Sequence, residues 1–388
     1  MIQKTLDKLR PHFQEGGKLS ALRSVFDGFE TFLVVPSATS RTGVSIHDSI
    51  DSKRIMSFVV IALMPALLFG MYNIGYQNAL AAGADTTACG ALLLYGLAVM
   101  LPKIVVSYVV GLGIEFVVAQ WKKEEIQEGY LVTGMLIPMI LPVETPLWML
   151  AVAVAFSVIF AKEIYGGTGM NIFNPALVAR AFLFFAYPTS MSGDKVWLAK
   201  DTFLGLGHTV ADGTTLATPL GEAAAQVAPT GDFWTYCVGL MPGSVGETSV
   251  IAIAIGAAIL LWTGIASWKT MGSVFVGGAL TAWLFNIGGL EGNAVANIPW
   301  YNHLVLGGFC FGAVFMATDP VTSARTEGGK YVYGLLIGAL AITIRVLNPG
   351  YPEGMMLAIL FMNMFAPLID YCFVQRNISR RLKRSQSK

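Results

Sequence analysis

The sequence has little charge for its length. Of its 388 residues, 13% are Asp, Glu, Lys or Arg and 55% are apolar, whereas roughly a quarter of residues are charged in soluble globular domains. The mean hydropathy is +0.63. The net charge of +1 gives no reason to expect a nucleic-acid partner. This balance excludes a water-soluble globular protein and indicates a chain whose main solvent is lipid.

Cysteine is scarce as well, and no two cysteines form a C-x-x-C pair. The four are Cys89, Cys237, Cys310 and Cys372. Metal and iron–sulfur sites on one chain usually need close spacing, so we expect these residues to be structural. The first 54 residues also lack the early apolar run of a secretory signal, and we expect them to form a retained cytoplasmic segment.

Long apolar runs, by contrast, are abundant. A helix needs roughly 17–25 apolar residues to cross about 30 Å of hydrocarbon, and such runs must be helical because lipid offers backbone groups no partners. The runs between charged or Gly/Pro-rich breaks predict spans over 55–77, 90–119, 130–142, 146–162, 172–188, 249–266, 271–289, 302–318, 331–347 and 354–374. The predicted fold class is therefore an all-α membrane protein with about ten transmembrane helices.

Lys and Arg concentrate on one side of this ten-span chain, with only Lys195 and Lys200 in the long connection after the fifth span. They occur in the N-terminal segment, in the tail, and at Lys122, Lys123, Lys162, Lys269, Arg325 and Lys330. By the positive-inside rule both termini are predicted to be cytoplasmic. The connection from about Pro188 to Glu247 then lies outside. It is much longer than the other connections between predicted spans, and long loops are usually functional or disordered.

The two halves of the chain resemble each other weakly. Leu131-Val132-x-Gly134 in the third span recurs as Leu304-Val305-x-Gly307 in the eighth. Two repeats of five spans must have opposite orientations, as in the inverted repeats of transporters, although chance would also explain so short a match. The predicted organisation is a cytoplasmic segment 1–54, a first repeat 55–188, an outside loop 189–248, a second repeat 249–374 and a basic cytoplasmic tail 375–388.

Three short segments are too rich in Gly, Pro, Asn or acids for plain membrane helices. The first, Gly166 to Pro175, carries Asn171 and Asn174 at the entry to the fifth span. An Asn side chain offers donors and an acceptor together, which suits the pyrimidine edge of a flavin and equally suits the cap of a broken helix. Ligand binding and capping both stay open for these two residues.

The second segment, Ala317 to Ser323, places Asp319 at the inner end of the eighth span. Further acids near membrane boundaries are Glu115, Glu128, Glu353 and Asp370. Ionisable groups at membrane depth are costly and tend to mark an ion path or a polar ligand. Carboxylates and freed backbone carbonyls are ligands that a hard cation such as Na⁺ prefers. Contact with water or arginine at the membrane surface is the alternative for each acid.

The third segment, Asp212 to Leu220, lies in the outside loop and contains Thr214, Thr215 and Thr218. On physical grounds alone it is a hydroxyl-rich turn.

Four motifs in a fixed order connect these segments to a known family. G-G-T-G-x-N-x-x-N-P-A-L, R-A-F-L-F-F-A-Y-P, F-M-A-T-D-P-V and N-P-x-Y-P-E-G-M-M-L-A-I-L follow one another along the chain. Together they resemble the B subunits of the Na⁺-translocating NADH:quinone oxidoreductases, the respiratory sodium pumps, over essentially the whole sequence.

The resemblance implies two flavins. In that family a transferase cleaves FAD and leaves FMN joined by a phosphodiester to the last threonine of a motif in the periplasmic loop. The matching acid, hydroxyl residue and acceptor are Asp212, Thr215 and Thr218, with Leu216 where a small residue is usual. A non-covalent riboflavin is implied at Asn171 and Asn174.

The resemblance also implies a quinone site and a sodium path. The ubiquinone positions of the family match Gly111, Gly113, Glu115, Glu128 and Gly129. The acids associated with sodium match Glu115, Asp319 and Asp370.

The implied setting is a six-subunit complex in the bacterial inner membrane. A partner subunit with FAD and an iron–sulfur centre would oxidise NADH, and electrons would reach ubiquinone through membrane metal centres, FMN and riboflavin, without hydride chemistry on this chain. Coupling to Na⁺ export requires that flavin reduction and cation binding favour the same conformation. The alternatives are the homologous subunit of a ferredoxin:NAD⁺ oxidoreductase, against which the polar segment 1–54 argues, and a non-redox cation transporter.

Overall fold

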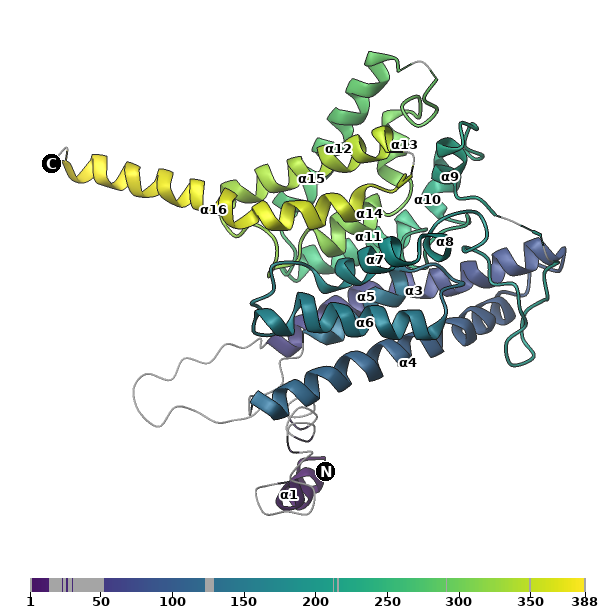
Figure 1. The fold of residues 1–388 in the computed structure, drawn as a ribbon, viewed down its shortest axis with the longest axis horizontal. Helices are drawn as coiled ribbons and strands as arrows, with labels where there is room; N and C mark the ends of the chain where they lie inside the picture. The colour runs from purple at the N-terminus through teal and green to yellow at the C-terminus, as the bar shows by residue number, and fades with distance from the viewer. Residues whose placement is uncertain are drawn as a thin grey trace.

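The computed structural model consists of helices joined by turns and loops (Figure 1). It describes residues 2–13, 23, 26, 30, 52–122, 129–211, 213–214, 216–290, 292–348 and 350–386. These residues contain no β-strand, only one isolated bridge between Phe203 and Leu206. The all-α class predicted from the sequence is confirmed.

Six helices of the described chain are long and apolar enough to cross a membrane, which confirms a multi-pass membrane protein. They are α3 (Ser52–Ala82), α4 (Cys89–Lys122), α6 (Leu147–Ala161) with the 3₁₀ turn that follows it, α12 (Trp268–Gly288), α15 (Glu327–Leu347) and α16 (Met355–Gln386). Three shorter apolar helices are α5 (Tyr130–Ile140), α7 (Pro175–Ala186) and α11 (Val250–Trp262).

The predicted span over 302–318 is interrupted. It consists of α13 (Trp300–Val305), the short α14 (Phe309–Phe311) and a π-helix, Gly312–Met316. Between α13 and α14 the backbone turns through Gly307, whose φ of +62° is a conformation that favours glycine. The count of ten spans and the inverted repeat therefore stay predictions.

Some helix pairs nevertheless recur between the two halves of the chain. In the first half α4 packs on α5 and α6, and α6 packs on α7. In the second half α12 packs on α13 and α15, and α15 packs on α16. The halves meet where α3 contacts α11 and where α7 contacts α16. In Figure 1, α3, α4 and α6 lie below α12, α15 and α16, with α7 between the two groups.

The closest packing in the second half uses small residues. A Cβ on Gly277 of α12 would lie 2.2 Å from the Leu335 carbonyl oxygen, and one on Gly338 of α15 would lie 2.1 Å from that of Val274. Without these side chains the two backbones can approach, which is a common basis of helix association in membranes.

The connections gather at the two ends of the helix bundle. The connection after α7 carries α8 (Pro188–Met191), α9 (Pro219–Ala224) and α10 (Phe233–Val238), on the right of Figure 1. The end of α16 projects from the opposite side, because residues 375–386 of the predicted tail continue this helix. The one other named helix, α1 (Ile2–Phe13), lies near the N-terminus.

Candidate functional site

Helix α7 begins with a fully formed cap. The Asn174 side-chain oxygen accepts hydrogen bonds from the backbone N–H groups of Ala176, at 3.0 Å, and Leu177, at 3.4 Å, and Pro175 occupies the first helical position. The capping alternative for Asn174 is therefore correct. It does not exclude the binding alternative, because the same residue also lines a cavity.

This cavity, the Asn174 pocket, is bordered by both halves of the chain. Gly129, Lys162, Asn171, Asn174 and Asp319 are among its lining residues, together with side chains of α3, α5 and α11. The empty space between them measures about 790 Å³, open solvent at the mouth included. Residues predicted for riboflavin, quinone and sodium are thus brought to one place.

The polar groups of this pocket are arranged by local turns. Asn171 accepts a hydrogen bond from the Gly169 N–H at 3.3 Å and donates one to the Phe173 carbonyl at 3.0 Å. The positive φ of Gly169, +91°, lets the chain turn before it reaches α7.

Asp319 follows the π-helix and caps the next turn. Its carboxylate accepts hydrogen bonds from the Val321 N–H, at 3.1 Å, and the Thr322 hydroxyl, at 2.9 Å. The Asn174 side-chain nitrogen lies 3.5 Å from the same carboxylate. This contact joins the start of α7 to the turn that follows the π-helix, across the boundary between the two halves.

Glu115 reaches the Asn174 pocket indirectly. It forms an ion pair with Lys162, and each side chain is only 4% exposed. Lys162 lines the pocket, whereas the second carboxylate oxygen of Glu115 is buried with no hydrogen-bond partner in the described chain. A buried pair with one unsatisfied oxygen is an energetic liability, which makes its place beside the pocket notable.

The predicted quinone glycines do not share one environment. A Cβ on Gly111 would lie 1.9 Å from the Tyr130 ring, and one on Gly129 would lie 2.4 Å from the Thr168 side chain. Nothing lies within 4 Å of such an atom on Gly113, which is exposed. Glu128 is outside the described residues.

A second cavity, the Thr218 pocket, lies near the other end of α7. Thr218 is the N-cap of α9, where its hydroxyl accepts a hydrogen bond from the Gly221 N–H at 3.1 Å. The cavity measures about 840 Å³ with its open mouth, and Phe184, Trp197 and Tyr351 are its aromatic lining residues. The other two motif residues, Asp212 and Thr215, are outside the described residues.

A charge cluster forms one wall of the Thr218 pocket. Arg180 of α7, 4% exposed, pairs with Glu247 at 2.9 Å and with Glu353, and it donates to the Ile140 carbonyl at 2.5 Å. Arg345 is fully buried nearby and donates to the Glu353 carbonyl at 3.2 Å. The formal charges of the two arginines and two glutamates cancel. Arg180 also satisfies the Ile140 carbonyl at the end of α5, and Arg345 satisfies the His303 and Leu306 carbonyls at the end of α13.

Sequence reasoning missed the pairing role of these bases. It counted Lys162 only among the basic residues on the cytoplasmic side, and it gave no role to Arg180 or Arg345. The available signal was their position, since Arg180 and Arg345 each interrupt an apolar run.

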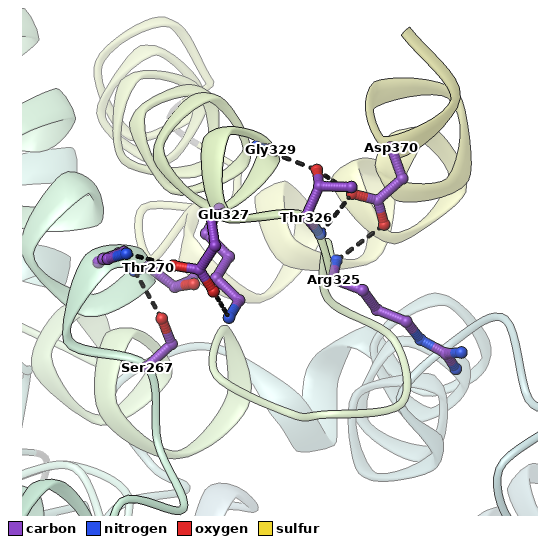
Figure 2. A network of polar contacts seen from close by, with 9 residues as sticks. Ser267, Thr270, Arg325, Thr326, Glu327, Gly329 and Asp370 are labelled. Atoms are coloured by element: carbon purple, nitrogen blue, oxygen red, sulfur yellow. Dashed lines mark hydrogen bonds and ion pairs between the residues drawn. The ribbon is translucent and has the colours of Figure 1, made fainter. Parts of the chain in front are cut away.

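Asp370 lies away from both pockets. Its carboxylate accepts hydrogen bonds from the N–H groups of Arg325, at 2.7 Å, and Thr326, at 2.9 Å, and from the Thr326 hydroxyl at 2.6 Å (Figure 2). Thr326 in turn caps α15 through the Gly329 N–H. These contacts fasten the start of α15 to α16, and the sodium role of Asp370 stays a prediction.

Comparisons with known proteins agree with the motifs. A sequence model described as the NQR2, RnfD, RnfE family matches residues 39–379. Proteins named as B subunits of Na⁺-translocating NADH-quinone reductases are similar over 99% of the chain. That of Chromohalobacter salexigens is 46% identical, with 96% of it covered, that of Stutzerimonas stutzeri 43% and that of Pseudomonas aeruginosa 42%, each with 99% covered.

Four motifs in order, a helical membrane fold and similarity along nearly the full length all lead to one assignment. The chain belongs to the NQR2, RnfD, RnfE family, which confirms the relationship predicted from its motifs.

Proposed function

We propose that this chain is the membrane subunit of a respiratory sodium pump that carries covalent FMN on Thr218 and riboflavin in the Asn174 pocket, and passes electrons from NADH to ubiquinone. The arrangement of the two pockets along α7 carries this proposal. Asn174 lines one pocket and Arg180 the other, six residues further on, or about 9 Å at the helical rise per residue. The two pocket walls on α7 are thus much closer to each other than the roughly 30 Å thickness of the hydrocarbon core.

The Thr218 pocket fits a flavin attached at its rim. Thr218 lines the cavity at the start of α9, and aromatic side chains offer faces for a planar ring system. The Thr248 hydroxyl, in a residue only 2% exposed, lines the cavity and has no hydrogen-bond partner in the described chain. A polar group of the isoalloxazine would supply the missing partner.

The Asn174 pocket fits a flavin held without a covalent bond. The Asn174 side-chain nitrogen has two N–H groups but makes one long contact, to Asp319, so a donor remains for a ring carbonyl. Lys162 lines the pocket as the cation of its pair with Glu115, so an ammonium group lies beside a bound flavin and favours electron density on its ring. When bound, riboflavin supplies the electron-transfer chemistry, whereas the chain orients it and limits water access.

Quinone and sodium enter this proposal at the same pocket. The buried Glu115–Lys162 pair is a point where a quinone headgroup could exchange a proton or hydrogen bond with the chain. Asp319 offers a carboxylate at the pocket wall, with the carbonyls of the interrupted span close by in sequence. Glu128, outside the described residues, belongs to the predicted quinone set, and Asp370, which lies away from this pocket, belongs to the predicted sodium set.

The names of the relatives support a multi-subunit setting, because each describes one subunit of a Na⁺-translocating NADH-quinone reductase. We propose for this chain a six-subunit inner-membrane complex with an NADH-oxidising FAD and iron–sulfur partner, a flavin transferase acting on the periplasmic loop, and cytoplasmic termini. The recurring helix pairs support two inverted repeats of five spans.

The test is a flavin inventory of the purified protein, coexpressed with and without the flavin transferase. We expect in-gel fluorescence of the denatured chain only with the transferase, and riboflavin in the solvent extract. A colourless protein in both samples would contradict the proposal and favour a non-redox transporter. Covalent flavin in a complex that uses ferredoxin and reduces no quinone would favour the homologous oxidoreductase.

A further inference from the structure

Helix α16 carries a buried amide at membrane depth. Asn363 is 1% exposed and lies in the apolar part of this helix, and Tyr333 of α15, fully buried, lies against it. Polar side chains in such positions must find partners within the protein, since lipid offers none. The partners of Asn363 therefore show what it holds in place.

One of those partners belongs to neither α15 nor α16. With the amide in the orientation that satisfies both of its ends, the Asn363 oxygen accepts from the backbone N–H of Asn174 at 3.3 Å. Its nitrogen lies 2.7 Å from the Tyr333 hydroxyl and donates to the Ile359 carbonyl at 3.2 Å. Asn363 thus links the second half of the chain to Asn174, the N-cap residue of α7.

Asn174 makes polar contacts through its backbone N–H and through both ends of its side-chain amide. Its backbone N–H meets Asn363, its side-chain oxygen caps α7, and its side-chain nitrogen faces Asp319. The last two groups lie at the wall of the Asn174 pocket, while Asn363 does not line that pocket. A change at Asn363 would therefore act on a ligand indirectly, and its contact with Asn174 is the direct link to a lining residue.

We propose that Asn363 is a positioning residue for the Asn174 pocket: its bond to the Asn174 N–H sets the pocket wall and hence the affinity for riboflavin. This inference rests on the proposed function of the pocket. Its rival is a simple polar link between α15 and α16, made by Asn363 and Tyr333 alone.

Two substitutions separate these roles. Asn363→Leu removes the acceptor of the Asn174 N–H, whereas Tyr333→Phe removes the α15–α16 bond and leaves that acceptor in place. We expect Asn363→Leu to weaken riboflavin binding roughly tenfold. Tenfold corresponds to about 1.4 kcal/mol, which lies in the range for leaving a buried N–H without a partner. Tyr333→Phe should stay within about twofold of the wild type.

The measurement is riboflavin titration of complexes first stripped of non-covalent flavin. Covalent FMN per chain serves as the internal check on folding and should be unchanged in both variants. Thr343→Val is the matched control, because within the described residues the Thr343 hydroxyl bonds only the Ala339 carbonyl of its own helix. If Asn363→Leu does not accumulate, Asn363→Ser, whose hydroxyl is too short to reach α7, should show the same loss.

Equal losses in Asn363→Leu and Tyr333→Phe would overturn the positioning role in favour of the polar link, and unchanged affinity in Asn363→Leu would overturn it outright. Wild-type protein with covalent FMN but no extractable riboflavin would instead overturn the riboflavin assignment itself, on which this inference rests.

Discussion

The two pockets along α7 differ in what would hold their ligands. In the Thr218 pocket a covalent bond to the rim would keep a flavin present whatever the affinity of the cavity. In the Asn174 pocket no such bond is expected, and the wall is assembled from residues of both halves of the chain. Occupancy of the first pocket should therefore depend on one hydroxyl, and occupancy of the second on the packing of several helices.

A tether works by raising the effective concentration of the ligand, commonly to the millimolar range for short linkers. Damage to the walls of the Thr218 pocket should then change the properties of its flavin more than its presence. Damage near the Asn174 pocket should release flavin. Substitutions in the two pockets can break or sharpen this contrast, beginning with the largest expected effect.

Removal of the covalent attachment should eliminate the flavin bound to Thr218 and leave the Asn174 pocket unaffected. We expect Thr218→Ala to abolish covalent flavin and leave extractable riboflavin unchanged, because Ala offers no oxygen for the phosphodiester. The lost cap of α9 costs only about 1 kcal/mol, so the protein should remain in the membrane. In-gel fluorescence checks this, with Thr214→Ala as the control. Persistent fluorescence in Thr218→Ala would move the acceptor to Thr214 or Thr215.

Damage to the charged wall of the Thr218 pocket should reduce stability instead. Arg180→Met leaves Glu247 and Glu353 without their shared cation in a buried site, and breaking such a cluster costs about 3–5 kcal/mol. We expect a lower midpoint of thermal unfolding, with covalent flavin retained in the protein that folds. Lys269→Met is the control, because the pair of Lys269 with Glu327 is partly exposed and such pairs contribute little to stability. Equal shifts in both variants would contradict a special role for the cluster.

The sequence predicted the helices well where hydrophobicity alone decides them. Nine of the ten expected spans coincide with one described helix each, within a few residues at most ends. The expected span over 302–318 is interrupted, and hydropathy does not reveal the break because the stretch around Gly307 and Gly308 is as apolar as its neighbours. A Cβ on Gly308 would lie 2.8 Å from the Glu247 carboxylate, a close approach that depends on residues far apart in sequence.

The site was predicted residue by residue rather than as an arrangement. Motifs named Asn171, Asn174 and Asp319, but no pattern in the sequence shows that one pocket contains all three. Lys162 gave no sign of its pairing with Glu115, because Glu115 lies in α4 and Lys162 follows the end of α6, far away in the sequence. Contacts between distant segments arise from packing, which composition and spacing do not encode directly.

Two neighbouring glycines offer a sharper test near the Asn174 pocket. Gly111→Val must displace the Tyr130 ring, whereas Gly113→Val projects into open space. Forcing a side chain into a packed site costs about 1–3 kcal/mol. We expect Gly111→Val to lower quinone reduction by about tenfold, while NADH still reduces the flavins. Gly113→Val should have wild-type quinone kinetics. Normal kinetics in both would remove these two glycines from the quinone site.

The smallest expected effect concerns ion coupling at Asp319. Its carboxylate makes the contacts of a cap, to Val321 and Thr322, and also faces the Asn174 pocket. Asp319→Asn keeps an oxygen for the cap but removes the negative charge that would attract Na⁺. We expect the Na⁺ concentration for half-maximal quinone reductase turnover to rise by about fivefold, with assembly and covalent flavin unchanged. Steady-state turnover across a Na⁺ series measures it.

Thr322→Val separates the charge from the cap, because it removes the hydroxyl that donates to Asp319 and leaves the carboxylate in place. If the charge matters, this variant should keep the Na⁺ dependence of the wild type even where its turnover falls. If Asp319→Asn and Thr322→Val both lose turnover with unchanged Na⁺ dependence, Asp319 serves the turn after the π-helix, and the sodium path lies elsewhere. A shift in Asp319→Asn alone would place a cation beside the pocket that the two halves of the chain build together.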